Sequence, residues 1–184
     1  QALGSKVEVD FAPGEGTHDG LEPIPASALT PPPGHKGQGL LGEYFVAFQR
    51  DGLPKLERVD PTINFHWEMA SPAPELPDDH FAVRWTGTLT PPQSGMYMLA
   101  LRSDDGSRLY LDDKLVVDNW GDHAPTLKTA EIELKGGQAY EIRLDYFEGV
   151  LGASVELLWQ RTVKDPLRMV AEAARKADVV IAAV

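Results

Sequence analysis

Residues 83–120, VRWTGTLTPPQSGMYMLALRSDDGSRLYLDDKLVVDNW, decide the fold. Apolar residues alternate with small or polar ones up to Pro91-Pro92, again after Gly95, and a third time after the acidic segment 103–107. Alternation with a period of two residues is typical of β-strands that bury one face. The stretch therefore predicts strand, turn, strand, acidic turn, strand, turn and strand.

Short motifs inside and around this stretch follow a recognisable order. They are Gly42-Glu43-Tyr44-Phe45, Phe81-Ala82-Val83-Arg84-Trp85-Thr86-Gly87, Ser94-Gly95-Met96-Tyr97, Ser103-Asp104-Asp105-Gly106, Leu109-Tyr110-Leu111-Asp112, Asp118-Asn119-Trp120, residues 140–148 and residues 155–159. Together they resemble the protective-antigen-type β-sandwich module, a lectin-like domain, over roughly two thirds of the chain. The resemblance implies a mainly β chain built around an antiparallel β-sandwich. Members of that family occur as appendages or insertions in carbohydrate-active enzymes and adhesins.

Composition narrows the function classes. The 184 residues carry 17 basic and 28 acidic side chains, a net charge of −11, which disfavours a nucleic-acid or anionic-membrane partner. Cysteine is absent, so no disulfide, thiolate metal site or thiol nucleophile is expected. No apolar run approaches the ~20 residues that span a bilayer. Residues 1–10 lack the pattern of a signal peptide, so the signal of an exported parent is expected upstream of this segment.

Both ends of the chain have a different pattern from the middle. Asp165-Pro166 predicts a helix start, apolar residues then recur at helical spacing, and the apolar run 179–184 is typical of a strand in a parallel sheet. At the other end, residues 7–11 alternate as a short strand, and the segment after them is rich in Gly and Pro.

These patterns predict an inserted domain. We expect a fragment of a host α/β domain at 1–13, a linker at 14–38, the sandwich at 39–162, and a helix and strand of the host at 163–184. The arrangement resembles family 3 glycoside hydrolases, mostly β-glucosidases, some of which carry such an insertion. The alternative is that both ends are local packing elements of a free-standing module.

No catalytic carboxylate is expected in this segment. Glycoside hydrolysis needs two carboxylates on either side of the bond, and the acidic pairs here are Asp78-Asp79, Asp104-Asp105 and Asp112-Asp113. Neighbours in an extended chain point to opposite faces, so none of these pairs is expected to act together. The resemblance places the nucleophile and the acid/base outside this segment, and we expect the segment alone to be inactive.

Asp104 and Asp105 have two interpretations. In the adhesin branch of the resembled family, an Asp-Asp pair joined by a cis peptide binds Ca²⁺, which in turn binds the sugar. That branch also uses an Asn or Asp in a late loop, and the corresponding residues 148–152 contain neither. The alternative is a hairpin turn in which Gly106 supplies a positive φ.

Candidate sugar contacts lie in two predicted loops. Trp120, Asp122 and His123 share one loop, and Phe147 and Glu148 share another, between strands expected at 140–146 and 153–159. A rigid sheet positions such loops for binding. Trp120 has a second interpretation, as a cap over the end of the sandwich.

The remaining tryptophans are predicted to be structural. Trp85 and Trp159 lie on apolar faces of their strands, and Trp67 follows a strand-like segment.

The function implied by the resemblance is an accessory module of a retaining β-glucosidase-like hydrolase. Its partners are β-linked glucosides or oligosaccharides and the host's own barrel and α/β domains. No cofactor is required, although Ca²⁺ is possible, and the family favours a periplasmic or extracellular location. The alternatives are an autonomous Ca²⁺-dependent carbohydrate-binding or adhesin module, and a structural spacer without sugar binding.

Overall fold

A computed structural model describes residues 20–47, 52–162 and 175. Apart from Arg175, the predicted host fragments at 1–13 and 163–184 lie outside these residues. Within the described part of the chain, the search for a helix with the length and hydropathy of a membrane span finds none.

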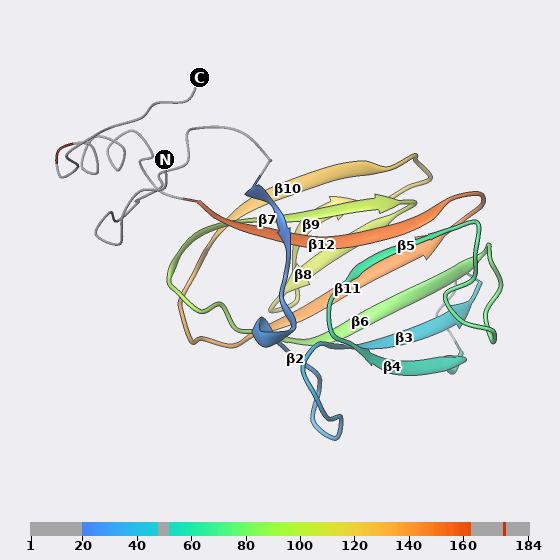
Figure 1. Cartoon of the computed structure of the whole chain (residues 1–184), viewed down its shortest axis with the longest axis horizontal. Coiled ribbons are helices and arrows are strands. Elements are labelled where there is room, and N and C mark those ends of the chain that lie inside the picture. The colour runs from blue at the N-terminus through green and yellow to red at the C-terminus, as the bar shows by residue number, and fades with distance from the viewer. Residues whose placement is uncertain (1–19, 48–51, 163–174, 176–184) are drawn as a thin grey trace, which may run out of the picture. The chain divides into compact units, whose positions relative to one another are not determined.

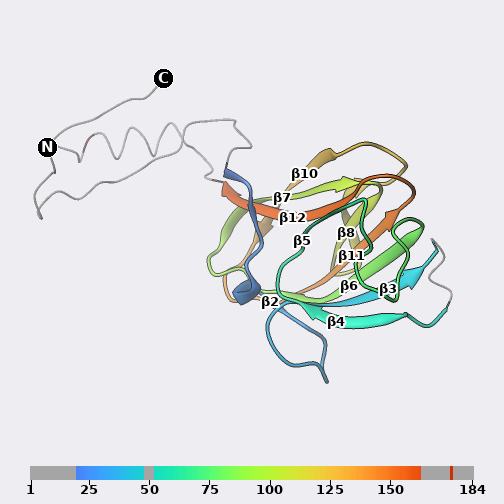
Figure 2. The ribbon, with the colours of Figure 1, turned by 45° about the vertical axis from the view of Figure 1, so that its right-hand side comes forward.

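The described residues form two antiparallel sheets, which Figures 1 and 2 show as two layers. The five-stranded sheet contains β1 (Glu22–Pro23), β5 (Asn64–Glu68), β7 (Gly95–Asp104), β10 (Thr126–Leu134) and β12 (Ala153–Thr162). The seven-stranded sheet contains β2 (Leu29–Thr30), β3 (Leu40–Val46), β4 (Leu56–Asp60), β6 (Phe81–Leu89), β8 (Ser107–Leu111), β9 (Lys114–Asn119) and β11 (Tyr140–Glu148). The predicted antiparallel β-sandwich is confirmed, and the four strands predicted around 83–120 are β6 to β9.

The core lies between the sheets and follows from the alternation in the sequence. Trp85, Tyr44 and Tyr146 have no exposed surface, as expected for inward-facing positions of β6, β3 and β11. Trp67 and Trp159 are partly buried against this core, so the structural role predicted for the other tryptophans is confirmed.

A buried carboxylate joins three strands of the seven-stranded sheet. Asp60 accepts hydrogen bonds from the Tyr44 hydroxyl (2.6 Å), from Trp85 Nε1 (2.7 Å) and from Arg58 Nε (2.7 Å). Burial, followed by the charge of Asp60, raises the pKa of Tyr44 well above its ordinary value. These bonds connect β4 to β3 and β6, and they satisfy polar groups that are expensive to leave unpaired.

The predicted linker 14–38 differs from the structure in its described part. The sandwich unit spans Leu21–Thr162, and β1 and β2 pair with β12 and β6. Ile24 and Leu29 are buried in the core. The high Gly and Pro content hid two short strands, and the buried Ile24 and Leu29 anchor this segment to the sandwich.

Four of the connections between strands lie at one end of the sandwich. Phe81 pairs with Glu148, Asp104 with Ser154, and Ser107 with Asn119. The β5–β6, β7–β8, β9–β10 and β11–β12 connections therefore lie at the same end of the fold. We call this the loop end.

Candidate functional site

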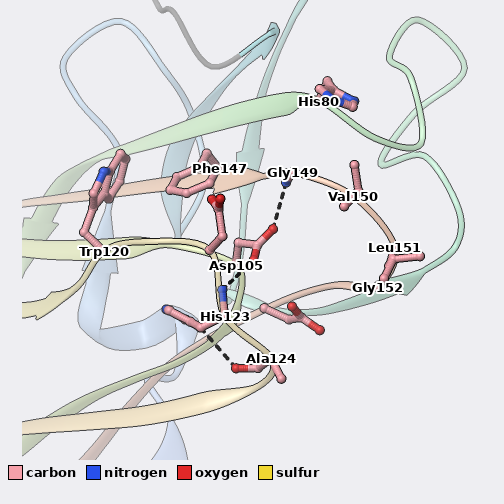
Figure 3. A pocket seen from close by; sticks show the side chains of 12 residues that line it. His80, Asp105, Trp120, His123, Ala124, Phe147, Gly149, Val150, Leu151 and Gly152 are labelled. Atoms are coloured by element: carbon pink, nitrogen blue, oxygen red, sulfur yellow. Dashed lines mark hydrogen bonds between the residues drawn. The ribbon is translucent and has the colours of Figure 1, made fainter.

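The loop end contains a pocket of about 730 Å³, shown in Figure 3. Its lining residues are His80, Asp104, Asp105, Trp120, Asp122, His123, Ala124, Phe147, Gly149, Val150, Leu151 and Gly152. All the predicted site residues except Glu148 therefore lie on one cavity. The volume is in the range of pockets that bind small organic ligands.

Asp104 and Asp105 both face this pocket, contrary to the expectation that neighbouring carboxylates point to opposite faces. The reason is that β7 ends at Asp104, so strand alternation does not extend to Asp105. The peptide bond between the two residues is cis. Burial, and next the charge of Asp105, raise the pKa of Asp104.

The Asp105 carboxylate connects two loops. Its Oδ1 accepts a hydrogen bond from the backbone N–H of His123 (2.8 Å), and its Oδ2 accepts one from the backbone N–H of Gly149 (2.9 Å). Asp105 is buried, so these charge-assisted bonds are only weakly screened. They hold the β9–β10 and β11–β12 loops against the end of β7, and this fixes the shape of the pocket.

Gly106 does not have the positive φ that the turn interpretation predicted. It is required for a different reason, because a Cβ at this position would overlap the ring of Phe147. The turn thus brings the backbone close enough for Phe147 to line the pocket. This part of the turn prediction is wrong: glycine is needed at position 106 for close packing against Phe147, and not for its backbone conformation.

Trp120 lies at the pocket rim with 40% of its surface exposed. The edge-to-face contact with Phe147 has a centroid separation of 4.7 Å, and the Arg108 guanidinium lies 4.8 Å from the Trp120 ring. Asp118 in turn accepts a hydrogen bond from Arg108 Nε (2.9 Å) and one from the Trp120 backbone N–H (3.2 Å). The ring is therefore held in place while part of it remains accessible.

Glu148 is the predicted site residue that does not line the pocket. It has no exposed surface, because β11 continues through Glu148 instead of ending before Phe147. The Tyr146 hydroxyl lies 2.6 Å from the Asp104 carbonyl oxygen and 3.1 Å from Glu148 Oε2. The hydroxyl has only one hydrogen, so it donates to one of these two oxygens. If Glu148 is protonated, its own hydrogen can be donated to the Tyr146 hydroxyl, and both contacts are then hydrogen bonds. Burial raises the pKa of Glu148 to about 7; the Tyr146 hydrogen bond opposes the shift, and Asp105 and Asp104 add to it.

The raised pKa of Glu148 predicts a pH dependence of stability. The pKa of this carboxyl is near 4.5 in the unfolded chain and about 7 in the folded protein. Its contribution to the free energy of unfolding therefore falls as the pH rises from 4.5 to 7, and it stays constant above pH 7. In Glu148→Gln, which has no proton to lose, the Tm should rise relative to wild type between about pH 5 and about pH 8. Thermal unfolding at both pH values checks this, and a difference independent of pH would contradict it.

The two neighbouring carboxylates of the pocket are not by themselves a complete Ca²⁺ site. Among the described residues, no group of three or more His, Asp or Glu side chains is arranged to hold a metal ion. Ca²⁺ takes about six to eight oxygen ligands, and both Asp105 oxygens already accept backbone hydrogen bonds. Asp104 and Asp105 alone therefore fall short of the ligand set for Ca²⁺.

Comparison with known proteins identifies the family. The PA14 domain matches residues 36–167. The chain belongs to the PA14 domain family. Two relatives of this PA14 chain are larger proteins of different kinds. The anti-sigma-I factor RsgI3 of Acetivibrio thermocellus is 36% identical over 125 residues, which is 67% of this chain and 19% of that protein. Probable beta-glucosidase K of Aspergillus fumigatus is 28% identical over 203 residues, 95% of this chain and 26% of that protein.

Two solved structures illustrate the range of this PA14 fold. The β-glucosidase from Kluyveromyces marxianus has a TM-score of 0.68 at 22% identity, over 88% of this chain and 22% of that one. The PA14 sugar-binding domain from an RTX adhesin has a TM-score of 0.51 at 19% identity, over 67% of this chain and 90% of that one. At these identities the likeness establishes the shared fold. This PA14 chain thus spans about a fifth to a quarter of the length of the two relatives above.

Sequence reasoning missed part of the pocket. Val150 and Leu151 contribute exposed apolar side chains, and Gly149 and Gly152 pass close to the two carboxylates. Their signal in the sequence was an apolar pair between two glycines, in a connection where polar residues are usual.

Proposed function

We propose that this PA14 domain is an accessory carbohydrate-recognition module of a family 3 β-glucosidase-like hydrolase. In this proposal its loops shape the entrance to the host's active site and form part of the leaving-sugar subsite. The observation that carries the proposal is the loop-end pocket, in which aromatic rings and carboxylates line a cavity of about 730 Å³.

The chemistry of the pocket supports a sugar ligand. Trp120 and Phe147 offer apolar ring surfaces, which suit the C–H faces of a sugar ring. The Asp104 and Asp122 carboxylates accept hydrogen bonds, and sugar hydroxyls donate them. Because Asp105 fixes both loops, the pocket is organised before a ligand arrives, which lowers the entropic cost of binding.

The extent of one alignment supports the proposal that this module belongs to a larger host enzyme. The match to Probable beta-glucosidase K covers 95% of this chain, more than the sandwich alone, and only 26% of that protein. This is what we expect if the segments on both sides of the sandwich belong to a larger enzyme. In such an enzyme the module positions the distal part of the substrate, and bond cleavage is left to the host.

Excising residues 21–162 from the full-length hydrolase tests this proposal. We expect kcat/KM on β-linked gluco-oligosaccharides to fall at least tenfold, because contacts to the leaving sugars are lost. Activity on 4-nitrophenyl β-glucoside, whose leaving group is one small ring, should fall much less. An equal loss on both substrates would argue that the sandwich only stabilises the host.

A second candidate is an autonomous Ca²⁺-dependent sugar-binding module. It is favoured by the placement of Asp104 and Asp105 side by side on the pocket. Titration calorimetry of the chain with β-glucosides, with added Ca²⁺ and then with excess chelator, separates the two candidates. Our first proposal expects weak binding by the isolated chain, with the same affinity in both conditions, whereas affinity that disappears with chelator would support the second.

A further inference from the structure

A second cavity lies on the outer face of the seven-stranded sheet, away from the loop end. It is a groove of about 320 Å³, within the range of pockets that bind small ligands. Its floor is formed by the adjacent strands β6, β11 and β8 (Figure 1). Along β11, Arg143 in this groove is four residues, or about 13 Å, from Phe147 in the loop-end pocket. We call this separate cavity the outer groove.

Strand register brings polar side chains together on the floor of the outer groove. Arg143 of β11 lies between Tyr110 of β8 and Thr86 of β6. Ile142 is buried in the core, so its neighbours Glu141 and Arg143 point to the outer face of the sheet. The groove therefore has a cation, a carboxylate and hydroxyl groups on one rigid surface.

A proline segment forms a wall of the outer groove. Pro32 and Pro33 line it and come directly after β2, which pairs with β6. A Cβ at Gly87 would overlap the carbonyl oxygen of Thr30, so glycine at this position lets the segment approach the sheet closely. The proline rings and the Tyr110 ring add apolar surface to the polar floor.

The Arg143 guanidinium is held in the groove with unused hydrogen-bonding capacity. It lies 4.0 Å from the centroid of the Tyr110 ring, and its Nε is 3.7 Å from Asp145 Oδ2, too far for a hydrogen bond. Within the described part of the chain, this buried Nε has no hydrogen-bond acceptor. On the strands to either side, Arg84 Nε and Arg108 Nε each donate to an aspartate. The Arg143 side chain is 34% exposed, so a ligand in the groove can reach its outer N–H groups.

The charges of the outer groove favour a neutral ligand that both donates and accepts hydrogen bonds. Arg143 offers donors, whereas Glu141 and Asp113 offer carboxylate acceptors. Two carboxylates against one cation, on a chain of net charge −11, disfavour an anionic ligand. Sugar hydroxyls both donate and accept, and the C–H faces of a sugar ring suit the proline and tyrosine rings.

We propose that the outer groove is a second carbohydrate site, specific for a neutral sugar unit, with Arg143 as donor and Glu141 as acceptor. The inference goes beyond the proposed function, which uses only the loop end, and it does not require that the loop-end pocket bind a sugar. Two separate sites let the module hold one oligosaccharide at two places, which strengthens binding through a higher effective concentration.

An NMR titration of the full chain, followed at individual backbone amides, tests the inference. The ligands are methyl β-glucoside and methyl β-glucuronide, which differ only in that a carboxylate replaces a hydroxymethyl group. We expect the glucoside to cause saturable shifts at the Thr86, Tyr110 and Arg143 amides. The glucuronide should bind there about fivefold more weakly, because the carboxylates of the groove repel it.

Arg143→Met removes the guanidinium donors and keeps a long side chain. It should weaken glucoside binding at the outer groove by about tenfold and leave the titration at the His123 and Gly149 amides of the loop end unchanged. Arg161→Met is the matched control, because Arg161 lies in β12 of the other sheet and lines neither cavity. It should leave binding at both sites unchanged.

Glu141→Gln gives a second test that keeps the shape of the side chain. With one negative charge fewer, the preference for the glucoside over the glucuronide should shrink to about twofold or less. The inference is overturned if the glucoside causes no saturable shift at the groove amides, if the glucuronide binds there as tightly, or if both methionine variants weaken binding equally. Saturable shifts in the groove with none at the loop end would support it and overturn the proposed function.

Discussion

Asp60→Ala is expected to lower the free energy of unfolding by about 3 to 5 kcal/mol, the range for removing one partner of a buried ion pair. The substitution leaves the Tyr44 hydroxyl, the Trp85 indole N–H and the Arg58 guanidinium without their shared acceptor. Two of these donors are buried, so water does not readily replace the lost bonds. Chemical denaturation at neutral pH measures the loss.

Asp118→Ala is the matched control for this prediction. Asp118 also accepts hydrogen bonds from an arginine, Arg108, but it lies on the surface. Exposed pairs of this kind contribute less than about 1 kcal/mol, so the control should be only slightly destabilised. Losses of similar size in the two variants would show that the Asp60 network does not stabilise the sandwich in the way described here.

Asp105→Asn is expected to detach a pocket loop while preserving the shape of the side chain. Both carboxylate oxygens accept backbone N–H groups, from His123 and from Gly149. An asparagine has one carbonyl oxygen, so its NH₂ group must face one of these donors. We expect affinity for β-glucosides to fall by at least tenfold, because one loop loses its anchor.

Hydrogen exchange locates the effect of this substitution. The amides of His123 and Gly149 are expected to exchange faster in Asp105→Asn, with at least one of them accelerated about tenfold or more. Asp113→Asn removes the same charge from an exposed turn outside the pocket and should leave both rates unchanged. Unchanged exchange at both amides in Asp105→Asn would contradict the anchoring role.

The four strands around 83–120 were predictable because apolar residues alternate along them, as in β6 with Trp85, whereas the short β1 and β2 were not. Their positions followed from the residues alone, and so did the placement of Trp120 in a loop, whereas Phe147, also expected in a loop, lies in β11. The pocket was less predictable, because it depends on which loops share an end of the sandwich. That information lies in the register, such as the pairing of Phe81 with Glu148.

The errors have specific physical causes. Glu148 was expected in a loop, but β11 extends to include it and buries it. Gly106 was expected to supply a positive φ, but it is needed for contact with Phe147. Val150 and Leu151 were missed, because an apolar pair between two glycines in a connection gains meaning only once its exposure is known.

The most direct test of the carbohydrate site is an NMR titration of the chain with cellobiose, followed at backbone amides and tryptophan indoles. The account predicts saturable shifts at the His123 and Gly149 amides and at the Trp120 indole, which all belong to the loop-end pocket. No saturable shift at these three positions, or shifts confined to the separate groove around Tyr110 and Arg143, would contradict it.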